Sequence, residues 1–130
     1  MDISTEMLEI AKENVPEADF AQADIDTYQF PKGVDIVFAF ASLLHSSKES
    51  LFGLFTRMHN ALNEDGIVYM SLKRGDSYST AVVEDQYGPR KFYYYTRETL
   101  LEIAGSKFEE VFYEEQERIE TWFTVILRKK

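Results

Sequence analysis

A run of apolar residues from Val34 to Ala41, interrupted only by Asp35, constrains the fold more than any other segment of this sequence. A strand with one exposed face alternates apolar and polar residues, and this run does not. It therefore predicts a strand that is buried on both faces. Strands of that kind are typical of parallel sheets, so the sequence favours an α/β fold.

In three further segments the apolar residues are spaced as on one face of a helix. Each begins at a Ser or Thr, residue types whose side-chain oxygen caps helix N-termini. Ser46 and Glu49 have the spacing of a capping box. The helices are predicted at Ser4–Pro16, Ser46–Leu62 and Thr96–Gly105.

Further strands are indicated by short apolar or β-branched runs. They are predicted at Phe20–Ile25, Ile67–Leu72, Glu110–Glu115 and Trp122–Arg128. The short charged connection between the last two favours an antiparallel pair. The polar segment from Lys73 to Arg90 is predicted to be a long loop, and long loops in compact domains are often functional. The expected architecture is a mostly parallel sheet with helices on both faces and an antiparallel C-terminal hairpin.

Composition narrows the classes of protein that remain. The length of 130 residues suits a single domain, expected to span the whole chain. The chain has no cysteine, which excludes disulfides and thiolate metal sites. A net charge of -9 makes nucleic acid an unlikely partner. No membrane span or signal peptide is recognisable, so no membrane partner is expected and a cytoplasmic location is predicted.

The order of these segments carries a family resemblance. Asp2 opens a helix with a Met-Leu pair, Asp24-Ile25 follows a short apolar segment, and the turn Ser42–His45 follows the strand that begins at Val34. This series resembles the class I S-adenosylmethionine-dependent methyltransferases, of the small bacterial and archaeal type, over essentially the whole chain. The resemblance implies a Rossmann-like sheet, S-adenosylmethionine as the cofactor and methyl transfer to an acceptor, expected to be a small molecule.

The resemblance also assigns residues to the cofactor site. Asp2 would accept hydrogen bonds from the two ribose hydroxyls, and Asp24 would meet the adenine amino group. Ile25 would supply a backbone contact. The remaining residues implied at this site are Ile3, Ala41 and Ser42. Simpler interpretations stay open: Asp2 also suits a helix start, where the dipole favours acids, and Asp24 also suits a solvated loop.

On the substrate side, the resemblance points to Lys73, Arg90 and Tyr94. Arg90 would clamp an anionic group of the acceptor. His45 is the candidate catalytic residue, because a neutral imidazole could take a proton from the nucleophile. The alternative is that His45 only bonds a loop carbonyl. No metal ligands are indicated.

One departure from the family matters. Its glycine-rich loop precedes the position of Asp2, so we expect an N-terminally truncated chain whose activity requires a longer chain or a complementing N-terminal segment. The missing strands would leave unpaired sheet edges that favour association, as in a homo-oligomer, and would impair folding. A non-catalytic interaction subunit that completes its sheet by association is the alternative function. A different small α/β binding domain is a third possibility.

Overall fold

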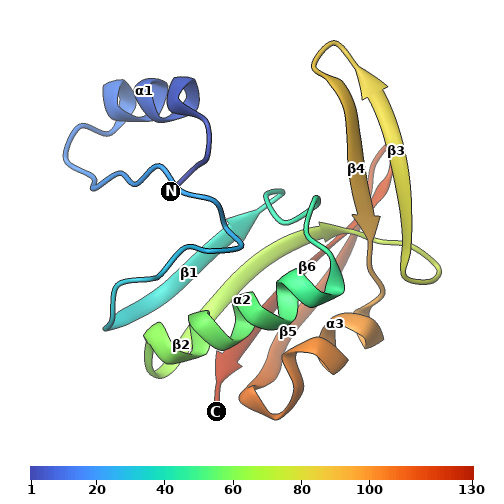
Figure 1. Cartoon of the computed structure of the whole chain (residues 1–130). Coiled ribbons are helices and arrows are strands. Elements are labelled where there is room, and N and C mark those ends of the chain that lie inside the picture. Colours follow the sequence, from blue (N-terminus) through green and yellow to red (C-terminus); the bar gives the residue numbers. More distant parts are fainter. The chain divides into compact units, whose positions relative to one another are not determined.

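The computed structural model describes all residues from Met1 to Lys130 and divides them into two compact units. The first unit is Met1–Phe30 and the second is Pro31–Lys130. The element order is that of an α/β chain with a mixed sheet, which confirms the predicted fold class (Figure 1). None of the helices is both long enough and apolar enough to cross a membrane.

Helix α1 of the first unit, Thr5–Asn14, begins as its sequence predicts. The Ser4 hydroxyl accepts a hydrogen bond from the Met7 amide at 3.3 Å, which caps the first turn. Only Leu8 of this helix is buried, because a unit of this size has little surface against which to bury an apolar face.

The strand predicted at Phe20–Ile25 is wrong. Only Gln22 pairs, in a single parallel bridge with Asp2, and the chain turns at Asp24 immediately afterwards. A strand exists only where a neighbour offers a ladder of backbone groups, and in this unit the neighbouring segment becomes helix α1 after a single bridge.

The second unit contains a four-stranded sheet in the order β1-β2-β6-β5. Its strands are β1 (Val34–Phe40), β2 (Leu62–Lys73), β5 (Phe108–Glu117) and β6 (Thr121–Lys129). Strands β1 and β2 are parallel, whereas β6 runs antiparallel to both β2 and β5. These strands confirm the predicted parallel pair and the closing antiparallel hairpin.

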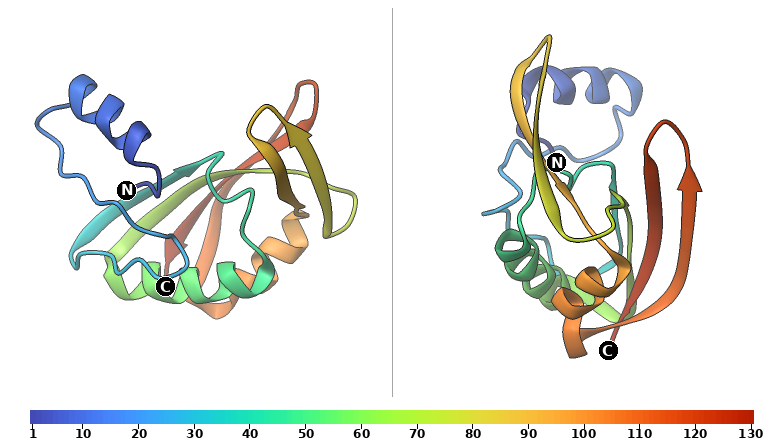
Figure 2. Two further views of the ribbon diagram at one scale, coloured as in Figure 1. Left: turned by 45° about the horizontal axis from the view of Figure 1, so that its top comes forward. Right: turned by 90° about the vertical axis from the view of Figure 1, so that its right-hand side faces the viewer.

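One face of this sheet is covered by α2 (Lys48–Ala61) and α3 (Arg97–Ala104), which lie along it in Figures 1 and 2. A short 3-10 turn at Gly105–Lys107 leads from α3 into β5. The cap of α2 is Ser47, which accepts from the Ser50 amide, and not the predicted Ser46, which is buried. The core between helices and sheet is apolar and includes Leu51, Phe55, Met58, Val68, Met70, Leu72, Leu100, Phe123, Val125 and Leu127.

Strand β1 is less buried than its sequence predicts. It forms an edge of the sheet, and only Ala39 on its helix-facing side is fully buried. Ile36, Phe38 and Phe40 point to the other face and remain 45%, 63% and 51% exposed. The prediction of burial on both faces is therefore wrong, because no helix of this unit covers the second face of the sheet.

The predicted loop after β2 contains a hairpin instead. Strand β3 (Ser79–Asp85) pairs with β4 (Gly88–Tyr94) in an antiparallel register, and the hairpin stands out from the sheet as an arm (Figure 2). Gly88 has a φ of 91°, which suits the tight turn between the two strands. The β-branched residues Val82 and Val83 favour a strand although their surroundings are polar.

Candidate functional site

The first unit brings together two aspartates that the sequence separates. Asp2 forms a parallel bridge with Gln22, and the Ala23 amide donates to the Asp2 carbonyl at 3.0 Å. Asp24 follows this paired segment directly. Two parallel segments end at the same edge, so both carboxylates lie at the carboxyl end of this small ladder.

Both aspartates are oriented in the same way by the backbone two residues ahead. The Ser4 amide donates to Asp2 Oδ1 at 2.8 Å, and the Asp26 amide donates to Asp24 Oδ1 at 2.9 Å. In each case the second carboxylate oxygen has no partner within the chain. Each carboxylate is thus fixed by one oxygen and keeps the other as an acceptor for a hydroxyl or amino donor.

The two isoleucines predicted at the cofactor site differ in exposure. Ile3 is 66% exposed, and its carbonyl already accepts from the Gln22 side chain at 3.2 Å. Ile25 is half-buried. An exposed apolar side chain beside Asp2 is suited to contact with a flat ligand such as a purine ring.

In the second unit, the predicted residues Ala41 and Ser42 lie just past the carboxyl end of β1. Ala41 has a φ of 47°, a left-handed conformation that non-glycine residues seldom adopt. Its amide donates to the Ser71 hydroxyl of β2 at 3.0 Å, which holds this turn against the neighbouring strand. Backbone strain of this type is typical of functional turns and costs about 1–3 kcal/mol.

His45 lies in the same turn and contacts β4. Its Nδ1 is 2.8 Å from the Lys91 carbonyl oxygen, and its ring packs against Phe92 with centroids 4.6 Å apart. The adjoining residues are also tied to β4, since the Tyr93 amide donates to the Leu44 carbonyl at 2.8 Å. The structure thus gives His45 the carbonyl contact that the sequence left open.

Lys73 ends β2 on the open face of the sheet, inside a cluster of aromatic rings. Its Nζ lies 4.3 Å from the Phe92 ring centroid, 5.9 Å from that of Tyr94 and 5.8 Å from that of Trp122. It also forms an ion pair of 2.6 Å with Glu120. The predicted residues Lys73 and Tyr94 are therefore neighbours. The Lys73 side chain is only 12% exposed, so its charge depends on these partners.

The electrostatics of this cluster follow from the ion pair. The hydrogen bond from Lys73 holds the pKa of Glu120 below its ordinary value. Burial raises the pKa of Tyr94, and the negative charge of Glu120 raises it further. Tyr94 therefore stays a neutral phenol that donates to Glu120 at 3.2 Å.

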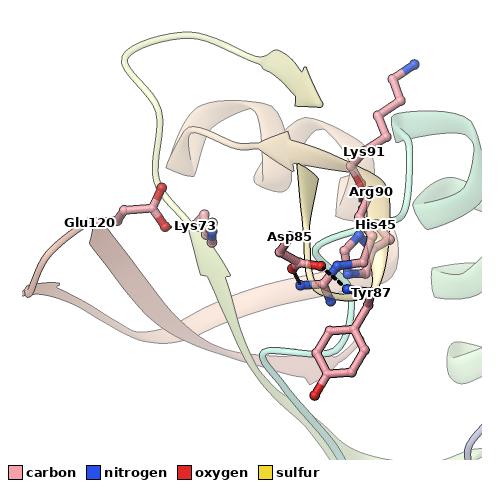
Figure 3. Close-up of polar contacts among 7 residues, drawn as sticks. All are labelled: His45, Lys73, Asp85, Tyr87, Arg90, Lys91 and Glu120. Atoms are coloured by element: carbon pink, nitrogen blue, oxygen red, sulfur yellow. Dashed lines mark hydrogen bonds and ion pairs between the residues drawn. The ribbon is translucent and has the colours of Figure 1, made fainter. Parts of the chain in front are cut away.

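Arg90 has a partner that the sequence analysis did not predict. Its guanidinium pairs with Asp85 across the hairpin, as Figure 3 shows, and lies 5.3 Å from the Phe92 ring. The Tyr87 amide and Arg90 together lower the pKa of Asp85, which keeps this carboxylate ionised. Arg90 thus has a carboxylate partner within the hairpin, and its contact with an anionic group of the acceptor stays a prediction.

Three contributors to the site were not predicted. Glu120 and Trp122 reach Lys73 from the β5–β6 turn and the start of β6, and Ser71 holds Ala41. Ser71 is the one polar residue without an aromatic ring in the predicted strand Ile67–Leu72, which is a signal in the sequence. Glu120 lies among other charged residues and carries no such signal.

Comparison with known proteins identifies the family of this chain. The family model described as a methyltransferase domain matches residues 1–66, which include both aspartates and His45. This chain belongs to the methyltransferase domain family, and the recognition of class I methyltransferases in its sequence is confirmed. A search of curated proteins finds no match.

Solved structures share the fold at low sequence identity. The PH0226 protein from Pyrococcus horikoshii OT3 has a TM-score of 0.79 at 17% identity, over 98% of this chain and 69% of that one. An S-adenosylmethionine-dependent methyltransferase from Mesorhizobium loti has a TM-score of 0.76 at 19% identity, over 98% and 78%. The 1,6-didemethyltoxoflavin-N1-methyltransferase of Burkholderia thailandensis, with its acceptor and S-adenosylhomocysteine bound, has a TM-score of 0.74 at 17% identity, over 97% and 57%.

Proposed function

We propose that this chain binds S-adenosylmethionine and serves methyl transfer to a small-molecule acceptor. Membership of the methyltransferase domain family supports the reaction class. The observation that supports cofactor binding is the pair Asp2 and Asp24. One oxygen of each carboxylate accepts a backbone amide, and the other oxygen is open to a ligand. When bound, the cofactor would supply a methyl group activated by a sulfonium.

The residues present fit this group by the chemistry of their atoms. A ribose offers vicinal hydroxyl donors, which suit the open oxygen of Asp2, and adenine offers an amino donor, which suits Asp24. Ile3 and Ile25 supply apolar surface or backbone beside them. In the second unit, Ala41 and Ser42 occupy a carboxyl strand end, where open α/β sheets bind ligands.

A small acceptor is favoured by the residues at the substrate side. Lys73 and Arg90 are each neutralised by a carboxylate, and Tyr94 belongs to a compact aromatic cluster. Such a surface offers no run of unpaired cations for a nucleic acid backbone. The 1,6-didemethyltoxoflavin-N1-methyltransferase that shares this fold has 1,6-didemethyltoxoflavin bound, which supports the same choice. We place this activity in the cytoplasm and in a single methyltransferase domain that spans the chain.

The test is calorimetric titration of the full chain with S-adenosylhomocysteine. Asp2→Asn keeps an oxygen for the Ser4 amide and replaces the open acceptor by a donor, so affinity should fall about tenfold or more. Glu9→Ala removes an exposed acid of α1 and should change affinity little. Equal affinity of wild type and Asp2→Asn would refute the assignment of Asp2, and a folded chain that fails to bind would refute the activity of this chain on its own.

A second function, an interaction subunit that completes its sheet by association, is favoured by strand β1. This edge strand carries the exposed side chains Ile36, Phe38 and Phe40, and a second copy or a complementing N-terminal segment would supply a partner strand. Sedimentation velocity tests it. Association that disappears in Phe38→Lys would support this function, and a monomer at all concentrations would argue against self-association.

A further inference from the structure

The outer surface of the helical layer contains a groove between α2 and α3, which lie side by side in Figures 1 and 2. The groove has a volume of about 410 Å³ and is open to solvent. Its walls are formed by the first two turns of α2 and the last turn of α3. The lining residues are Lys48, Glu49, Phe52, Glu102 and Ile103. None of them belongs to the candidate functional site.

Two apolar side chains interrupt the polar outer side of these helices. Helix α2 buries Leu51, Leu54 and Phe55 toward the sheet, so its opposite side is expected to be polar. Phe52 lies on that outer side and is 57% exposed, and Ile103 of α3 is half-buried at the groove. Apolar side chains with a charged rim of this kind are typical of a surface that another protein covers.

The charged side chains around Phe52 carry both signs and form no ion pair within the chain. Lys48, Glu49 and Glu102 line the groove. Lys107 places its Nζ 5.0 Å from the Phe52 ring centroid. The ion pairs of the chain involve other residues. Two carboxylates and two ammonium groups therefore lie around the exposed ring, and their charges cancel.

This balance of charges selects a second copy of the chain as the partner. Two copies with a net charge of -9 each repel one another, so they associate only through surfaces that are locally neutral or complementary. In a two-fold arrangement the same patch meets itself, and a charged patch must then carry both signs. The groove meets this condition. The outer strand β5 does not, because it carries several glutamates and no Lys or Arg.

The backbone of α2 is accessible beside Phe52. A Cβ at Gly53 would meet only Nη1 of Arg57, at 3.4 Å, so no packing within the chain requires a glycine there. Glycine is unfavourable in the interior of a helix, and its lack of a side chain allows another backbone to approach closely. The helix of a second copy can therefore lie close to α2 at this point.

We propose that the α2–α3 groove is a homodimer interface in which Phe52 of each copy inserts into the groove of the other. The two lysines of one copy then face the two glutamates of the other. An aromatic side chain in the middle of a polar rim is a typical anchor of such an interface. A patch made by a few turns of two helices is small, so the dimer is reversible.

This interface is distinct from association through β1. Helices α2 and α3 cover one face of the sheet, whereas Phe38 of β1 is exposed on the other face. The groove dimer should therefore persist in Phe38→Lys. It also requires no cofactor, so its test is independent of methyl transfer.

Charge exchange tests the interface in the full chain. Lys48→Glu with Lys107→Glu makes the patch acidic, and Glu49→Lys with Glu102→Lys makes it basic. In sedimentation velocity the wild type should dimerise, and each exchanged variant should do so about tenfold more weakly or less, because like charges then face each other. An equimolar mixture of the two variants should associate again as a heterodimer, since lysines then meet glutamates.

Two further variants serve as controls. Glu64→Lys with Glu84→Lys changes the net charge as much as the basic exchange does, at exposed positions of β2 and β3, and should leave dimerisation unchanged. Phe52→Ala removes the anchor without a change of charge and should weaken the dimer about tenfold. Because Phe52 is exposed, this variant should fold, which circular dichroism verifies.

Three results would overturn the proposal. The first is a wild-type chain that stays monomeric at about 1 mM. The second is a pair of exchanged variants that dimerise as tightly as the wild type, or that fold but do not associate when mixed. The third is association that is lost in Phe38→Lys and kept in Phe52→Ala, which would assign the dimer to β1.

Discussion

Lys73 Nζ and Glu120 form an ion pair of 2.6 Å that joins the end of β2 to the turn between β5 and β6. Lys73 is nearly buried, whereas Glu120 is 43% exposed. The pair therefore gives the ammonium its only carboxylate partner and leaves that partner in contact with solvent. Removal of the Glu120 carboxylate would therefore leave the Lys73 ammonium without a counter-charge, whereas the solvent-exposed surroundings of Glu120 would change little.

This pair predicts a pH-dependent contribution to stability. Lys73 lowers the pKa of Glu120 in the folded chain, so the contribution is complete above the ordinary value of 4.5 and disappears as the pH falls through the lower, folded value. Glu120→Gln should reduce the free energy of unfolding by about 1 kcal/mol at neutral pH, and by less in acid. Urea titrations of the wild-type protein and of Glu120→Gln across the acidic range measure this difference in the free energy of unfolding. A difference that grows in acid would contradict the assignment.

The buried hydroxyl of Tyr95 gives a second prediction. Burial raises the pKa of this fully buried phenol, which stays neutral and donates to the Ser46 carbonyl at 2.5 Å. Tyr95→Phe leaves that carbonyl without a partner and should cost about 1–3 kcal/mol of unfolding free energy. Tyr94→Phe is the control, because its hydroxyl is partly solvated and should cost less. Comparable losses in the two variants would mean that the Ser46 contact contributes little.

The left-handed backbone of Ala41 predicts a stabilising substitution. Glycine adopts a φ of 47° without a Cβ penalty, so Ala41→Gly should raise the free energy of unfolding by about 1 kcal/mol. Ala39→Gly, two residues earlier in extended β1, should lower it by a similar amount. Thermal unfolding of the two variants should therefore shift in opposite directions, and a destabilised Ala41→Gly would exclude the strained turn.

The core between α2 and the sheet gives a fourth prediction. Leu51 has no exposed surface, so Leu51→Ala should cost about 2–5 kcal/mol. Its neighbour Phe52 is 57% exposed on the same helix, and Phe52→Ala should cost much less despite the larger side chain. Denaturant unfolding followed by far-ultraviolet circular dichroism separates the two. Equal losses would place α2 in a different rotation about its axis.

Local signals explain which parts of the fold were predictable. Ser4 and Thr96 each cap a helix by accepting from the amide three residues ahead, so the local sequence contains the whole interaction. The segment Phe20–Ile25 has strand-forming residues but depends on a partner ladder that its unit does not provide. The β3–β4 hairpin was missed because the charged residues between Lys73 and Arg90 outweighed the β-branched run that begins at Ser79.

The candidate site residues divide in the same way, into those with local partners and those whose partners are distant in sequence. Asp2 and Asp24 were found through the family resemblance, and their shared orientation by neighbouring amides is a local turn that aspartate favours. The partners of Lys73 and His45 are distant in sequence, and only the folded chain brings Glu120 and the Lys91 carbonyl to them. The pair of Arg90 with Asp85 was not predicted, because it forms across a hairpin where the sequence predicted a loop.

The side chains and the outer backbone groups of β4 make contacts with different parts of the second unit. Arg90, Phe92 and Tyr94 turn toward the Lys73 cluster, while the backbone of Lys91, Tyr93 and Tyr95 is joined to the turn after β1 and to the end of β2. Because neighbouring side chains of a strand alternate, an insertion of one residue within β4 would exchange these roles. We therefore expect this arm to tolerate changes of length near its Gly88 tip, or in steps of two residues. A one-residue insertion next to Phe92 should separate His45 from the Lys91 carbonyl that it contacts.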